Sequence, residues 1–113
     1  MERNRQMNIE ATILSSFLDV DYYDDEHKEI FKLDPEVFSS EGFTFVAQQI
    51  NRFVDANKPL SLLYEKLDQV MEGTAYEFDY LFLLGRMHLR MSMVRKYYDD
   101  LVISHRRSIM KGI

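Results

Sequence analysis

The sequence contains no cysteine and few of the residues that interrupt helices. Among its 113 residues there are two prolines and four glycines, and neither Asn-Gly nor Asp-Gly occurs. Without cysteine, disulfide bonds and thiolate metal sites are excluded, which is compatible with a reducing compartment. Without the dipeptides of tight hairpins, a sheet built from hairpins is not expected.

Long apolar runs are absent as well. The apolar run from Tyr80 to Leu84 has five residues, whereas a transmembrane helix needs about 20. The first ten residues, MERNRQMNIE, lack the apolar core of a signal peptide. We therefore expect a cytoplasmic protein that does not bind membranes.

The residues that are present favour a single folded domain. Hydrophobic residues make up 46% of the chain, including eight Phe and seven Tyr, so disorder is not expected. The charge is distributed unevenly, because residues 1–85 carry a net −10 and residues 86–113 carry +5. A basic end on an acidic body indicates either an acidic partner or contact of that end with its own body.

Apolar residues recur three and four positions apart along most of the chain, which is the spacing of one helix face. The first such face predicts a helix with Asn8 as its N-cap. A short turn is expected to begin at Asp34-Pro35, since Pro suits the first helical position. The members of the first face are Ile9, Ile13, Leu14, Phe17 and Leu18.

Two further helices are predicted in the middle of the chain. Ser39 or Ser40 is the expected N-cap of the first, which Pro59 ends because it pushes the preceding residue out of helical geometry. Ser61 is the expected N-cap of the second, which ends at residues 72–74.

Residues 75–111 contain no proline and a single glycine, Gly85. As one helix they would span about 55 Å at about 1.5 Å per residue, whereas a domain of this size is about 35 Å across. We therefore expect a break near Gly85 or Ser92, or an end that projects. The prediction is an all-α bundle of about five to six helices, with a bundle subdomain over residues 1–83 and a long C-terminal helical segment over residues 84–113.

The C-terminal segment carries two apolar faces over residues 80–97, which predicts burial on both sides. One is a seam of coiled-coil spacing, made of Leu84, Met87, Met91, Val94, Tyr98 and Leu101. The other consists of Phe82, Leu89, Met93 and Tyr97.

From Tyr98 onward a single narrow stripe remains. It consists of Tyr98, Leu101, Val102, His105 and Ile109, with Arg95, Arg106 and Arg107 beside it. This pattern is typical of a docking helix that binds a partner with one face, and these eight residues are the predicted partner-binding site. The alternative is that the stripe packs on the acidic body of the chain itself.

An acidic stretch is the best candidate for a metal site. It contains Asp19, Asp21, Asp24, Asp25, Glu26 and His27, which are ligands for hard cations or transition metals. The stretch lacks the glycine and glutamate positions of a calcium-binding EF-hand loop, so a solvated acidic loop is favoured. No metal, cofactor or catalytic residue is expected. Nucleic acid is not expected as the main ligand, because the isoelectric point is about 5.1.

One part of the chain, about residues 9–70, resembles a known family. The residues that carry the resemblance are Ile9-Glu10-Ala11-Thr12-Ile13-Leu14, then Phe38, Val46-Ala47, Ile50, Asn57, Pro59 and Leu67. They are similar to the fold shared by the N-terminal domain of bacterial replicative helicases and the C-terminal, helicase-binding domain of bacterial primases. Gly42-Phe43 stands where helicases usually have His, and Ser61 where Asp often follows. Both departures favour the primase side.

The resemblance implies an interaction domain without activity of its own, because primer synthesis and unwinding belong to other domains in that family. It implies docking of primase onto the N-terminal domain of the replicative helicase, and modulation of helicase activity. A domain of this kind is expected to be monomeric when alone. The alternatives are a self-associating helicase N-terminal domain, a small metal-dependent enzyme or sensor using Asp19 to His27, and an unrelated helical adaptor that dimerises through the seam from Leu84 to Leu101.

Overall fold

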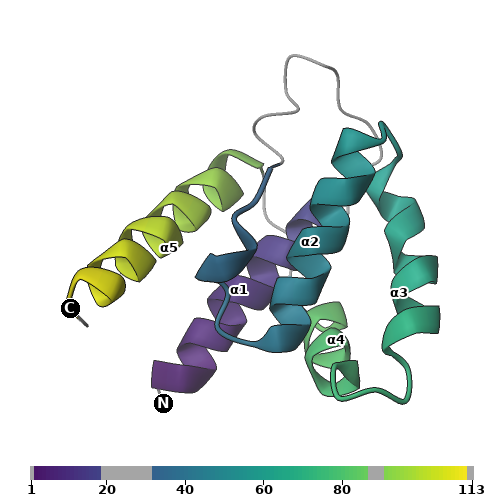
Figure 1. Cartoon of the computed structure of the whole chain (residues 1–113), viewed down its shortest axis with the longest axis horizontal. Helices are drawn as coiled ribbons and strands as arrows, with labels where there is room; N and C mark the ends of the chain where they lie inside the picture. Colours follow the sequence, from purple (N-terminus) through teal and green to yellow (C-terminus); the bar gives the residue numbers. More distant parts are fainter. Residues whose placement is uncertain (1, 19–31, 87–90, 112–113) are drawn as a thin grey trace.

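The computed structural model of the chain describes residues 2–18, 32–86 and 91–111 (Figure 1). These residues form helices and no strand, so the predicted all-α fold is confirmed. The elements are α1 (Glu2–Leu18), η2 (Pro35–Val37), α2 (Glu41–Asp55), η3 (Leu60–Leu62), α3 (Leu63–Met71), α4 (Glu77–Leu84) and α5 (Met91–Lys111), where η denotes a short 3-10 helix.

Helices α1 and α2 form the centre of the bundle (Figure 1). α5 packs against α1 on one side, α3 packs against α2 on the other, and α4 contacts both central helices. The apolar face predicted for the first helix points into this centre, where Ile13, Leu14, Phe17 and Leu18 are buried. They meet a matching face of α2 formed by Phe43, Val46, Ala47, Ile50 and Val54.

Two of the predicted helix caps are correct. The Ser40 side chain accepts a hydrogen bond from Phe43 N at 3.1 Å and begins α2. The Asp34 side chain accepts one from Glu36 N at 3.1 Å and begins η2. In both places a side-chain oxygen satisfies a backbone N–H that lacks a partner in the first turn of the helix.

The other two predicted caps are wrong. Asn8 lies inside α1, which begins six residues earlier. The first turns of α1 were missed because they are polar and show no apolar periodicity. Ser61 lies within η3, and α3 follows directly from Leu62 without a side-chain cap. A 3-10 turn there supplies the local hydrogen bonds that a capping side chain would otherwise supply.

The predicted helix ends agree with the structure. α2 ends at Asp55, and Asn57 takes a left-handed conformation, with φ of 58°, ahead of Pro59. α3 ends at Met71, and Gly73 has φ of 75°, a conformation that glycine adopts without steric cost.

The long C-terminal segment is interrupted at one of its two predicted positions. α4 ends at Leu84 with Gly85 as its C-cap, whereas α5 continues through Ser92 without a break. The prediction that this segment is buried on two sides is wrong for α5. Met93 is 46% exposed and Tyr97 40% exposed, whereas Val94 is buried. Two elements, α1 and η2, pack against α5, and they cover one of its faces.

A buried carboxylate connects α1 to the start of α2. Glu10 is fully buried and accepts hydrogen bonds from Ser39 N (2.5 Å) and from Ser39 Oγ (2.7 Å). The two bonds hold the residue that precedes the Ser40 cap. Burial raises the pKa of Glu10 above its ordinary value of 4.5, and the hydrogen bonds from Ser39 oppose that rise.

The raised pKa of Glu10 predicts how Glu10→Gln changes the pH dependence of stability. The folded chain binds the Glu10 proton more tightly than the unfolded chain does, so the contribution of Glu10 to the free energy of unfolding falls as pH rises above 4.5. Glutamine does not titrate. The free energy of unfolding of the wild type minus that of Glu10→Gln should therefore decrease with pH, as measured by urea unfolding from pH 4.5 to 7.5. A difference that grows with pH would show that the pKa of Glu10 is lowered instead.

Candidate interaction surfaces

The predicted partner-binding stripe on α5 is divided between the core and the surface. Tyr98 is 7% exposed and Leu101 6% exposed, so these two side chains pack within the chain itself, and their contact with a partner stays a prediction. Val102 is half-buried against the core and His105 is half-buried beside it. Beyond them, Ile109 is 53% exposed, and Arg106 and Arg107 are exposed. Therefore the last turns of the stripe are the part available to a partner.

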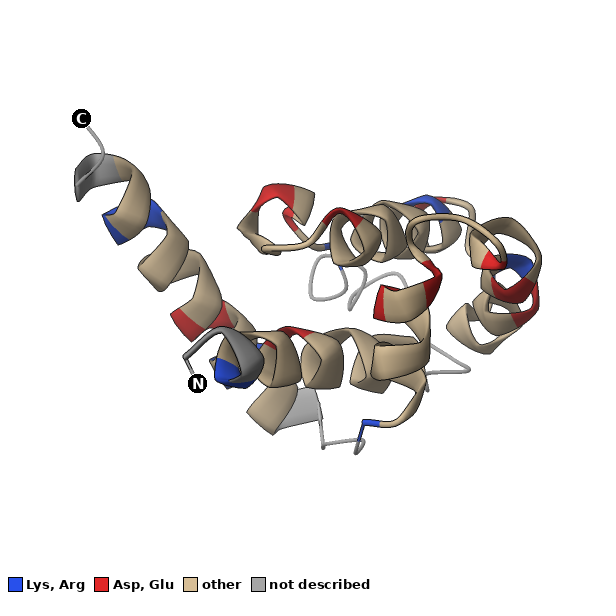
Figure 2. Ribbon diagram, turned by 90° about the horizontal axis from the view of Figure 1, so that it is seen from below, with Lys and Arg blue, Asp and Glu red and all other residues tan. Residues whose placement is uncertain are grey.

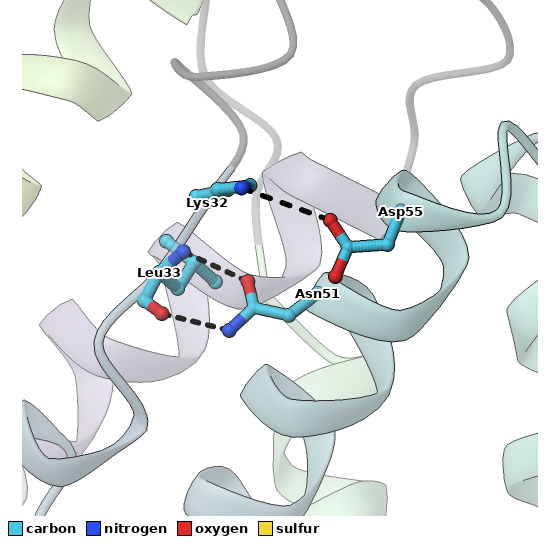
Figure 3. Close-up of polar contacts among 4 residues, drawn as sticks. All are labelled: Lys32, Leu33, Asn51 and Asp55. Carbon is cyan, nitrogen blue, oxygen red and sulfur yellow. Dashed lines mark hydrogen bonds and ion pairs between the residues drawn. The ribbon is translucent and has the colours of Figure 1, made fainter.

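Tyr98 is held in place by polar contacts as well as by burial. Its hydroxyl accepts a hydrogen bond from Asp34 N at 2.7 Å, and burial raises the pKa of the Tyr98 hydroxyl, so it stays protonated at neutral pH. The neighbouring Leu33 is bound through both of its backbone groups by the Asn51 side chain, at 2.8 and 2.7 Å (Figure 3). The segment at residues 32–34 therefore connects α2 to α5 and fixes the position of α5.

Lys32 and Asp55 add an ion pair to the same connection, with Nζ and Oδ1 3.8 Å apart (Figure 3). Both side chains are half or more exposed, so this pair contributes little to stability. The bidentate contact of Asn51 could not be predicted from the sequence, because a polar residue in the middle of a helix has the pattern of an ordinary surface position.

A groove of about 380 Å³ lies where α5 leaves the body. Its lining includes Gln6 of α1, Val37 and Phe38 at η2, and Leu101, His105 and Ser108 of α5. The groove marks the point at which the stripe on α5 passes from the core to the surface.

The last turns of α5 extend beyond the other helices in both views (Figures 1 and 2). We call this segment, residues 105–111, the α5 end. It carries Arg106, Arg107 and Lys111 and no acidic residue. Arg95 lies apart from it, three residues before Tyr98 at the start of the stripe, and its Nε is 3.5 Å from Asp99 Oδ1. The predicted basic border is therefore concentrated at the α5 end.

A second surface was missed by sequence reasoning. Phe78 is 68% exposed, Leu81 59% and Leu84 44%, and their spacing of three residues places them on one side of α4. We call these three residues the α4 face. The signal was the run from Tyr80 to Leu84: it is apolar on every side of a helix, a pattern that normally indicates burial all round. In the structure Tyr80 and Leu83 are the fully buried members of that run.

Carboxylates border the α4 face. Asp68 of α3 and Glu72 directly after α3, together with Glu77, Tyr80 and Leu81 of α4, line a cavity of about 320 Å³. The Tyr80 hydroxyl donates to Asp68 Oδ1 at 2.5 Å, and burial together with this carboxylate raises the pKa of Tyr80. The phenol is therefore protonated at neutral pH and holds α3 and α4 together.

The far end of α4 is attached to α1. Arg86 donates a hydrogen bond to Asn8 Oδ1, and its guanidinium carbon lies 4.3 Å from the centre of the Phe82 ring. The predicted seam and second face continue into Met87 and Leu89, which lie outside the described residues.

The predicted alternatives that involve metal concern a part of the chain that is not described. The stretch from Asp19 to His27 lies outside the described residues, so both interpretations of it stay predictions. Elsewhere, in the described part of the chain, no group of three or more His, Asp or Glu side chains is placed to hold a metal ion. None of the described helices combines the length and the apolar character needed to cross a bilayer.

Comparison of the chain with models of protein families, with curated protein sequences and with solved structures finds no match.

Proposed function

We propose that this chain is a non-catalytic interaction domain that docks primase onto the N-terminal domain of the replicative helicase in the cytoplasm and modulates helicase and priming activity during DNA replication. The observation that carries the proposal is the α5 end. Ile109 continues the stripe whose inner members are buried, but it is 53% exposed, with Arg106 and Arg107 beside it. An exposed apolar anchor bordered by arginines suits an acidic protein surface.

The choice of partner rests on the resemblance in the sequence. Seven of the residues that carry it are buried in one core, whereas Asn57 and Pro59 are exposed. The seven are Ile13, Leu14, Phe38, Val46, Ala47, Ile50 and Leu67. Glu10, from the same motif, holds Ser39 directly after Phe38. These positions therefore have a common structural role, which supports the primase and helicase fold as the frame of the proposal.

Three members of the seam through which the adaptor alternative would dimerise are buried. Val94, Tyr98 and Leu101 are buried against the chain's own α1 and η2 elements, so these side chains are not available to a second helix. A coiled-coil dimer through this seam would require α5 to leave the body and expose them.

Replacing Ile109 with alanine tests the proposal. We expect weaker binding to the cognate helicase N-terminal domain by about 1–3 kcal/mol, the range for a truncated anchor, with the melting temperature unchanged. Isothermal titration calorimetry measures the first quantity and thermal unfolding the second. The matched control is Ile103→Ala, which removes the same atoms from a residue of α5 that is 47% exposed on another face. Equal affinity for both variants and the wild type would argue against docking through the α5 end.

A further inference from the structure

The α4 face is a large apolar surface that the proposed docking of the α5 end leaves without a role. Its three members include the most exposed large hydrophobic side chain among the described residues, Phe78. Phe78 also lies 6.4 Å from Phe82, ring centre to ring centre, so the face continues inward as a packed aromatic surface. A contiguous exposed apolar patch of this kind marks a binding site more often than a scattered hydrophobic residue does.

The charge around the α4 face limits what can cover it. Residues 63–84 contain five acidic residues and one basic residue, a net charge of −4. Three of the acidic residues, Asp68, Glu72 and Glu77, lie at the cavity that Leu81 also lines. An apolar surface bordered by carboxylates favours an occupant that combines apolar and basic side chains.

The chain itself carries such an occupant. The α5 end presents Ile109 together with Arg106 and Arg107, and it extends beyond the other helices (Figures 1 and 2). Both α4 and α5 pack against α1, and Figure 1 shows them on different sides of it. The two complementary surfaces of one molecule therefore face different directions, as they must to join two molecules.

We propose that the α5 end of one copy docks on the α4 face of a second copy. Ile109 packs against Phe78 and Leu81, and the arginines at positions 106 and 107 face the carboxylates at the border. The contact is heterologous, so each pair keeps one free α4 face and one free α5 end, and association continues into a closed ring or an open chain. The inference departs from the expected monomer. It does not rest on helicase docking, because it requires this chain alone.

The mass of the full chain in solution tests this contact. In sedimentation velocity at low ionic strength, the average mass should rise with protein concentration, and the rise should shrink in high salt because exposed charge pairs are screened. Leu81→Ser and Ile109→Ser should each raise the protein concentration at which half of the chains are associated by about tenfold or more. Both positions are exposed, so the melting temperature should not change. A chain that stays monomeric at every concentration would refute the proposal.

Mixing the two variants identifies the head-to-tail geometry. Leu81→Ser keeps an intact α5 end and Ile109→Ser keeps an intact α4 face, so the mixture retains one productive contact and should form a one-to-one dimer and nothing larger. A symmetric contact between two α4 faces or two α5 ends would leave one variant associating as the wild type does, which contradicts the proposal. Leu81→Ser should also bind the helicase domain as the wild type does, so failure of either proposal is visible separately.

Discussion

Leu101→Ala is expected to lower the free energy of unfolding by about 2–5 kcal/mol, the usual cost of truncating a buried leucine. Leu101 is 6% exposed on the face of α5 that packs against the body, and it lines the groove beside Val37 and Phe38. The substitution removes buried apolar surface and leaves a cavity. A domain of this size has a total stability of about 5–15 kcal/mol, so the loss is a large part of it. Chemical denaturation measures the change.

The control for Leu101 lies two residues further along α5. Ile103→Ala removes atoms from a side chain that is 47% exposed and should change the free energy of unfolding by less than about 0.5 kcal/mol. The folded fraction of Leu101→Ala should bind the helicase domain with normal affinity. A stable Leu101→Ala variant that has lost binding would instead place Leu101 at the partner interface, as its position in the stripe first indicated.

Gly42→Ala is the second substitution with a large expected effect. Gly42 is buried in the first turn of α2, and a Cβ atom there would lie 2.6 Å from Asp79 Cβ and 2.9 Å from Asp79 Cγ. These atoms are close to the backbone of α4, so the helix itself must shift. The hydrogen bond from Gly42 N to Asp79 Oδ2, at 3.1 Å, is lost as well. We expect a loss of about 1–3 kcal/mol from the steric conflict, although alanine is the better helix former.

Gly85→Ala is the matched control for Gly42. A Cβ atom at Gly85 would lie 3.8 Å from Phe82 O, which is ordinary van der Waals contact, and the φ angle of −84° suits alanine. The same atoms are added at Gly42 in α2 and at the C-cap of α4, but only Gly42 lacks room for them. Equal melting temperatures for the two variants would show that α4 moves without cost. A loss confined to Gly42→Ala would show that the close approach of α2 and α4 fixes the position of the α4 face.

Local chemistry in the sequence determined the helical class of the fold and several of its boundaries. Ser40 and Asp34 can be identified as caps because a side-chain oxygen satisfies a backbone group two or three residues away. Pro59 and Gly73 mark helix ends for equally local reasons. The inner face of α1 could also be predicted, since helical periodicity is a property of neighbouring residues. Glu10 could not be recognised as buried, because its partner Ser39 is 29 positions away.

The tertiary structure alone decided which apolar residues became core and which became surface. In the sequence the stripe from Tyr98 to Ile109 is continuous, yet Tyr98 and Leu101 are buried and Ile109 is exposed. The two apolar faces over residues 80–97 predicted burial on both sides, yet Leu81 and Leu84 are exposed. Periodicity shows which side of a helix is apolar, but burial requires another element opposite that side. Where a neighbouring helix begins, ends or crosses is set by the packing of the whole chain, and the candidate surfaces lie where that packing stops.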